Sequence, residues 1–401
     1  MRYPEKGAVI AGVGISRIGR RTGIPGLDLT LEAARAAIAD AGLRPVDIDG
    51  MATLGDTPAR AVAGALGIDA GYRGGGFDTG GLLAPVMSAA VAVGEGRARH
   101  VLVYRTVHMM GGTVSPPRPS PRREGATARA TDESAVRPDA RRPRAIPAMS
   151  DVGPLLDAHA YSAANWLAMH CRRHMELYGT TREQLGWLAV TSRSHAAANP
   201  RALYRDPITM DDYLGARPVS SPFGLLDCDV PVDGSIAIVV STGDYAGDIP
   251  HRPVRVEAVG GASGAGGWTQ RPDYPKMASA DAAAQMWSRT DLRPADIDVA
   301  ELYDGFTFLT IAWLEALGIC ADGEGGPFVE GGHRIALDGA LPLNTYGGQL
   351  SAGRMHGYWV LHEACLQLRG AAGDRQLSGR PDVAVVSAGG GPIAGCMLLT
   401  G

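Results

Sequence analysis

The sequence has few cysteines, and their spacing matches no common framework. None of the five, Cys171, Cys228, Cys320, Cys365 and Cys396, belongs to a Cys-x-x-Cys pair. Scattered cysteines of this kind argue against a disulfide scaffold and against a zinc site. We therefore expect reduced thiols and no bound metal.

A large charge excess and long apolar runs are also lacking. The formal net charge is −4, from 42 acidic and 38 basic residues, so electrostatics provide no basis for binding nucleic acid or an anionic membrane. No apolar run approaches the roughly 20 residues of a spanning helix, and the first residues show no signal-peptide core. A soluble, cytoplasmic protein is expected.

Glycine, by contrast, is abundant, and the chain repeats itself. Glycine accounts for 55 of 401 residues. An Ala-rich helical segment followed by Leu43-Arg-Pro-Val-Asp-Ile-Asp49 returns later as a similar segment followed by Leu292-Arg-Pro-Ala-Asp-Ile-Asp298. A second repeated motif occurs as Gly96-Arg-Ala-Arg99 and as Gly379-Arg-Pro-Asp382, and each copy leads into a strand-like run. An internal repeat predicts two units of the same architecture.

Strand-like runs alternate with Ala-rich helical segments along the whole chain. The strands are expected at 8–11, 101–104, 236–240, 254–259, 299–302 and 383–386. This alternation is typical of an α/β fold with helices between sheets. We predict two similar α/β halves, 1–245 and 246–401.

One stretch differs in composition from the rest. Residues 113–147 are rich in Pro and Arg and have almost no large apolar side chain. This composition predicts a long surface loop. A solvated lid is the favoured interpretation. The alternative is a loop that binds an acidic partner or the phosphates of a cofactor.

Two motifs are explained more simply by a structural role than by a functional one. Gly12-Val-Gly14 follows a strand, but its spacing does not fit a dinucleotide fingerprint. His170 and His174 lie one helical turn apart within 161–178, yet no third metal ligand is evident. Packing of a helix face is the preferred reading for the histidines.

The C-terminal third carries the richest chemistry. Leu343-Asn-Thr-Tyr-Gly-Gly-Gln-Leu-Ser-Ala-Gly-Arg-Met-His-Gly357 precedes a helix, and Ser387-Ala-Gly-Gly-Gly-Pro392 follows the last buried strand. Small residues in succession let backbone N–H groups converge on an anion. Glu301-Leu-Tyr-Asp-Gly305 ends another strand. Three such loops predict one shared pocket.

With these motifs the chain resembles the thiolase superfamily, in its sterol-carrier-protein-type branch. Further matches are Tyr178-Gly-Thr-Thr-Arg-Glu-Gln-Leu185 and Leu225-Leu-Asp-Cys-Asp-Val-Pro-Val-Asp-Gly234. The resemblance implies a five-layered αβαβα fold of two halves, a homodimer, and a small zinc-ribbon and OB-fold partner protein. It implies no tightly bound cofactor, with coenzyme A entering as part of an acyl-CoA substrate.

The family's sulfur nucleophile is missing from its expected place. The resemblance aligns Asp78-Thr-Gly-Gly81 with the nucleophile turn, Gly353-Arg-Met355 with a Gly-His-Pro motif, and Ser387 with a second cysteine. Tyr303 takes the place of a strand-end histidine. Without a thiolate, Claisen chemistry through an acyl-enzyme is not expected.

The pattern is closest to the steroid side-chain retro-aldolases, in which a tyrosine matching Tyr303 is catalytic. The predicted catalytic residues are Tyr303, Tyr346, His356, Arg354 and Asp304. The predicted substrate- and oxyanion-binding residues are Asp78, Gly80, Gly81, Gly348, Ser387, Gly389, Gly390 and Gly391. Arg354 stands where those aldolases often have a second tyrosine, and if adjacent it would lower the pKa of Tyr303.

Structural alternatives remain for several of these residues. Tyr303 could be a hydrogen-bonded core phenol, His356 could cap the following helix, and Asp304 is favoured as a structural hydrogen-bonding partner. For the whole chain we expect an aldolase that cleaves a β-hydroxyacyl-CoA with a bulky or branched acyl part. The alternatives are a non-catalytic acyl-CoA- or lipid-binding or scaffold subunit and, third, a Claisen acyltransferase.

Overall fold

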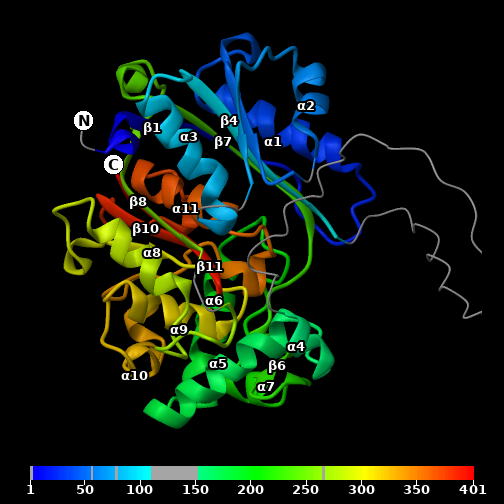
Figure 1. Ribbon diagram of the computed structural model, residues 1–401, viewed down its shortest axis with the longest axis vertical. Coiled ribbons are helices and arrows are strands. Elements are labelled where there is room, and N and C mark those ends of the chain that lie inside the picture. Colours follow the sequence, from blue (N-terminus) through cyan, green and yellow to red (C-terminus); the bar gives the residue numbers. More distant parts are fainter. Residues whose placement is uncertain (1–2, 56, 77–79, 110–151, 264–266) are drawn as a thin grey trace, which may run out of the picture.

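The computed structural model describes residues 3–55, 57–76, 80–109, 152–263 and 267–401 (Figure 1). Its main sheet contains β1 (Ala8–Ile15), β2 (Gly50–Thr53), β3 (Tyr72–Gly75), β4 (His100–His108), β7 (Asp233–Thr242), β8 (Val254–Ser263), β9 (Val299–Glu301), β10 (Val383–Gly390) and β11 (Ile393–Thr400). A second, two-stranded sheet pairs β5 (Pro218–Ser220) with β6 (Phe223–Gly224).

The helices alternate with these strands. They are α1 (Gly26–Asp40), α2 (Ala59–Leu66), α3 (Ala84–Gly94), α4 (Gly153–Asp157), α5 (Ala163–Tyr178), α6 (Arg182–Ala197), α7 (Met210–Leu214), α8 (Ala278–Trp287), α9 (Thr307–Ala316), α10 (Gly325–Val329) and α11 (Tyr358–Arg369). Each strand-like run expected from the sequence lies in a strand, the run 299–302 apart from its last residue.

The strand order shows the internal repeat in three dimensions. The nine strands run β3-β2-β4-β7-β1-β8-β11-β10-β9, so the two halves meet where β1 pairs with β8. Strands β2 and β9 follow the two Arg-Pro-x-Asp-Ile-Asp motifs, and strands β4 and β10 follow the second repeated motif, at 96–99 and 379–382. In each half the two strands pair in parallel, β2 with β4 and β9 with β10. A parallel bridge from Ala300 to Leu343 stands where β3 stands in the other half.

The helices complete five layers. Helix α1 packs on β1, β4 and β7, and α8 packs on β8, β10 and β11. Helices α3 and α11 touch strands of both halves and therefore lie between them. The predicted α/β, five-layered fold is confirmed by this arrangement. The division at 245/246 falls between β7 and β8 and stays a prediction.

The helical region below the sheet in Figure 1 brings distant parts of the chain together. Helices α4 to α7, inserted between β4 and β7, share this region with α9 and α10, inserted after β9, and α6 touches both α9 and α10. The insertion 113–147 lies outside the described residues. None of the described helices has the length and apolarity to cross a membrane.

Glycine in the first and eighth strands serves helix packing. A Cβ at Gly12 would lie 2.1 Å from the Ala37 carbonyl oxygen of α1, and one at Gly260 would lie 2.0 Å from that of Ala282 in α8. The two positions are equivalent in the two halves, so the backbone contact recurs. Gly12-Val-Gly14 is therefore explained by packing.

The two helical histidines also serve packing. The His170 ring lies 2.8 Å from the Trp268 carbonyl oxygen and 3.0 Å from that of Pro275. The His174 ring contacts Glu315 and the Thr180 hydroxyl. The preferred packing reading is correct, and no metal-ligand cluster occurs within the described segments.

Gly12→Val should destabilise the fold strongly. The new side chain meets the α1 backbone, which cannot move without the sheet, so we expect a loss of about 3 kcal/mol in the free energy of unfolding. Gly64→Ala, at an exposed position of α2 with free space around it, should instead stabilise by up to about 1 kcal/mol. Urea unfolding of both variants tests the pair, and equal effects would contradict it.

Candidate active site

Three segments far apart in the sequence are joined beyond the carboxyl end of β9. The Asp229 N–H donates to the Gly305 carbonyl at 3.2 Å, which ties the segment before β7 to the loop after β9. The Val230 N–H donates to the Gln349 carbonyl at 3.0 Å, and the Arg354 N–H donates to the Val230 carbonyl at 2.8 Å. These backbone hydrogen bonds set the positions of the side chains in the candidate site.

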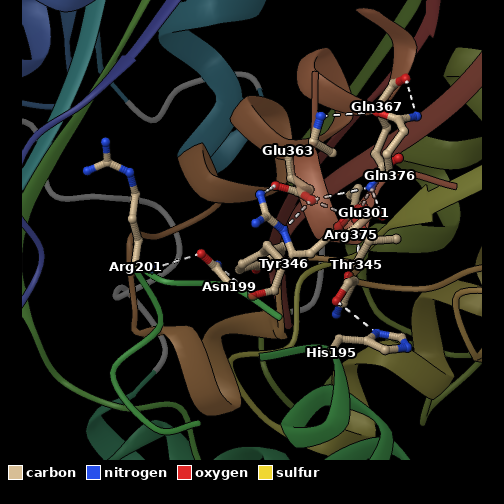
Figure 2. A network of polar contacts seen from close by, with 12 residues as sticks. His195, Asn199, Arg201, Glu301, Thr345, Tyr346, Glu363, Gln367, Arg375 and Gln376 are labelled. Carbon is tan, nitrogen blue, oxygen red and sulfur yellow. Dashed lines mark hydrogen bonds and ion pairs between the residues drawn. The ribbon is translucent and has the colours of Figure 1, made fainter. Parts of the chain in front are cut away.

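A buried polar network holds the loop 343–357 in place (Figure 2). The Thr345 hydroxyl lies 2.7 Å from Glu301 Oε1 and 3.0 Å from Glu363 Oε1. Arg375 donates two hydrogen bonds of 2.9 Å, one to each oxygen of Glu363. The loop is thereby anchored to β9 through Glu301 and to α11 through Glu363.

The network fixes the protonation of Glu301. Both carboxylates are fully buried, but among the described residues a single guanidinium, that of Arg375, pairs with them, and it binds Glu363. Burial, with the charge of Glu363 added, raises the pKa of Glu301 well above its ordinary value. The shift favours the protonated form of Glu301, which avoids burying a second negative charge.

Tyr303 lies two residues after the end of β9 and is 8% exposed. Its backbone N–H donates to Ser387 Oγ at 3.1 Å, which joins two of the predicted residues. Burial raises the pKa of Tyr303 above its ordinary value; the charge of Asp229 adds to this and that of Arg354 opposes it. Arg354 acts in the predicted direction, but the expected net lowering is wrong because burial dominates. The phenol stays protonated.

Asp304 organises the turn that faces it. Its carboxylate accepts the N–H groups of Gln349 at 2.9 Å and Leu350 at 3.4 Å, as expected of a structural hydrogen-bonding partner. Burial raises its pKa to about 6. Gly348 makes room for this contact, since a Cβ there would lie 2.0 Å from Asp304 Oδ2.

Arg354 pairs with a carboxylate absent from the predicted site. Its Nη1 lies 3.3 Å from Asp229 Oδ1. Burial raises the pKa of Asp229 to about 7, Arg354 opposes that shift, and Asp304 adds to it. Asp229 lines a cavity of about 490 Å³ together with Cys228 and Leu350.

The thiol of Cys228, beside that cavity, is not a nucleophile. It donates to the Gly224 carbonyl at 3.5 Å, and burial raises its pKa to about 12. Burial also raises the pKa of the other four cysteines. A neutral thiol in each case leaves no thiolate for an acyl-enzyme.

His356 turns towards β4 and away from the helix that follows it. Arg105 Nη2 lies 2.7 Å from His356 Nδ1, and because a guanidinium only donates, Nδ1 accepts and Nε2 carries the proton. Burial, with Arg105 and Arg354, lowers the pKa of His356 well below its ordinary value. Arg105 and His356 line a second cavity of about 680 Å³. A neutral N–H donor, that of His356, therefore stands at the wall of this cavity.

The other predicted residues are more varied in position. Tyr346 is fully buried and stacked on Trp359, and its hydroxyl has no hydrogen-bond partner among the described residues. Gly389 and Gly390 pair with β11, and the Gly391 N–H approaches Met277 Sδ at 3.0 Å. The remaining glycines pack near β11, with Gly80 against Gly395 and Gly81 beside Ile393. Asp78 lies outside the described residues.

Sequence reasoning missed Asp229, Arg105 and Gln349. Asp229 lay within a quoted motif, but nothing in a linear motif shows that its carboxylate turns towards Arg354. Arg105 meets His356 across 251 positions of chain. Gln349 links both halves of the loop, since its side chain accepts the His356 N–H at 2.9 Å.

Comparisons with known proteins agree with this architecture. Residues 260–398 match the family model described as thiolase C-terminal domain-like. The chain is 34% identical to a steroid side-chain-cleaving aldolase of Thermomonospora curvata, over 98% of this chain and 97% of that one. It is 35% identical to a 17-hydroxy-3-oxo-4-pregnene-20-carboxyl-CoA lyase of Mycobacterium tuberculosis, over 98% of each. A solved Ltp2-ChsH2(DUF35) aldolase superposes with a TM-score of 0.85, at 32% identity and 98% coverage of both chains.

Glu301→Gln should change the pH dependence of stability. Because the folded-state pKa of Glu301 is raised, its contribution to the free energy of unfolding is complete below about 4.5 and is lost as the pH rises towards the folded pKa. Relative to wild type, the variant should gain about 1.4 kcal/mol for each pH unit over that window. Denaturant unfolding between pH 5 and 8 measures this, with Glu183→Gln, on the exposed surface of α6, as the control. A constant offset would contradict the assignment.

Proposed function

The chain belongs to the thiolase superfamily, in the branch that contains the steroid side-chain-cleaving aldolases, and we propose that it cleaves a β-hydroxyacyl-CoA by retro-aldol chemistry. The observation that carries the proposal is the protonated phenol of Tyr303 set beside the Arg354–Asp229 pair, in a chain whose five thiols are all held neutral. Such a site can move protons, but it cannot form an acyl-enzyme on sulfur.

Retro-aldol cleavage has two chemical requirements, and these residues meet both. One is stabilisation of the thioester enolate that forms as the C–C bond breaks. We propose as donors for that oxygen the Nε2–H of His356, at the wall of the cavity of about 680 Å³, and the guanidinium of Arg354, which contacts both Met109 of that cavity and Asp229. The other requirement is proton transfer, for which Tyr303 is the proposed acid. Ser387 and Gly348 position Tyr303 and Asp304, respectively.

The substrate and partners are inferred from the relatives. We propose an acyl part that is bulky or branched, as in the steroid named for the relative from Mycobacterium tuberculosis. Coenzyme A is part of the substrate, with no tightly bound cofactor. The solved structure of a relative is described as an Ltp2-ChsH2(DUF35) aldolase, which names a second component, ChsH2(DUF35). We propose a partner of this kind, a small zinc-ribbon and OB-fold protein, for a cytoplasmic homodimer of this chain.

Tyr303→Phe should abolish cleavage while leaving the fold intact. The phenol is the proposed acid, so release of ketone or aldehyde from a β-hydroxyacyl-CoA panel should fall at least about 100-fold. Melting temperature and binding of a thioester lacking the β-hydroxyl should stay unchanged. The assay is run with and without the co-expressed partner protein. Unchanged turnover would remove Tyr303 from the mechanism.

A further inference from the structure

Asp229 has the surroundings of a reactive carboxylate. Its side chain is 8% exposed, and the exposed part lines the cavity of about 490 Å³. Arg354 is the ion-pair partner found for it among the described residues, at 3.3 Å, and its backbone is tied to Gly305, two positions after Tyr303. One carboxylate edge is therefore held, and the group still faces open space.

The neighbouring ionisable groups are less suited to accept a proton. Tyr303 is a neutral phenol, and Nδ1 of His356 is occupied by Arg105. Asp304 accepts backbone N–H groups with both carboxylate oxygens and is 1% exposed. Glu301 is fully buried within the network behind the loop. Asp229 is the group near this site that combines a free acceptor edge with contact to a cavity.

We propose that Asp229 is the general base of this site and that Tyr303 is the acid that complements it. The inference rests on the proposed function and deepens it. Asp229 takes the proton of the substrate's β-hydroxyl. The O–H electron pair forms the new carbonyl, and the Cα–Cβ bond pair moves into the thioester to give its enolate.

The cycle closes without a further reactant. The enolate Cα takes the phenolic proton of Tyr303, which restores the thioester and completes the released acyl-CoA. Protonated Asp229 then returns its proton to the Tyr303 phenolate. The net change moves one proton from the β-hydroxyl to Cα, so both residues end as they began.

Arg354 gives this division of labour its physical basis. Burial alone would hold Asp229 protonated, and the guanidinium draws the pKa back to about 7, where the base and its conjugate acid are both accessible. The resemblance placed a second tyrosine at position 354, and this chain has a cation there.

Asp229→Asn tests the assignment against a matched control. Amide in place of carboxylate keeps the shape but removes the basic group, so kcat should fall by about 100- to 10 000-fold. Binding of a thioester lacking the β-hydroxyl should change little. Asp211→Asn, an equal charge change on the exposed surface of α7, should leave turnover as in wild type. Full activity of Asp229→Asn would overturn the inference.

The pH profile provides an independent readout if Asp229→Asn does not fold. The charged and titratable groups that face Asp229 are Arg354, Asp304, Tyr303 and Cys228, with Arg193 and Arg20 across the cavity. Because Arg354 opposes the rise in the Asp229 pKa, Arg354→Gln should move the acidic limb of kcat/KM to higher pH. An unmoved limb would overturn the inference.

These outcomes separate the inference from the function on which it rests. If Tyr303→Phe loses cleavage and Asp229→Asn retains it, the aldolase remains and Asp229 is not its base. If the wild-type chain with its partner cleaves no β-hydroxyacyl-CoA, the proposed function falls and takes the inference with it.

Discussion

The position of the loop 343–357 depends on two buried carboxyl groups, of which one alone pairs with a guanidinium among the described residues. Glu363 takes both hydrogen bonds from Arg375, while Glu301 stays protonated and meets Thr345. Breaking a buried ion pair strands a charge and costs several kcal/mol, so the arrangement has little freedom. Since Thr345 belongs to the loop and Glu301 to β9, the network sets the loop's distance from the strand.

The same loop then distributes its contacts to the reactive side chains. The turn that begins at Gly348 presents its N–H groups to Asp304, and the Gln349 side chain accepts the His356 N–H. The backbone of Arg354 is tied to Val230, beside Asp229. A shift of the network would therefore displace the proposed acid, base and oxyanion donors together.

Burial separates the roles of these groups. Desolvation disfavours the charged form of each acid, so Tyr303 is held as a neutral phenol and the thiols as neutral sulfur. Arg354 partly offsets this for Asp229, its ion-pair partner. The site thereby contains a neutral donor, Tyr303, whose pKa responds to the charge of an ionisable acceptor, Asp229. That combination suits C–C cleavage without covalent catalysis, and it agrees with the aldolase names of the full-length relatives.

Local patterns in the sequence were enough to identify the layers, the strands and the family. The repeated Arg-Pro-x-Asp-Ile-Asp motifs mark equivalent strands β2 and β9, because local turn chemistry and hydrophobic patterning act over short stretches. Tyr303, Asp304, Arg354 and His356 were identified for the same reason, since each lies in a compact motif. The tertiary structure alone decided that Asp229 meets Arg354, that Arg105 fixes the His356 tautomer, and that the pKa of Tyr303 rises. Those outcomes depend on desolvation and on contacts between residues far apart in the chain, and neither quantity is encoded in local spacing.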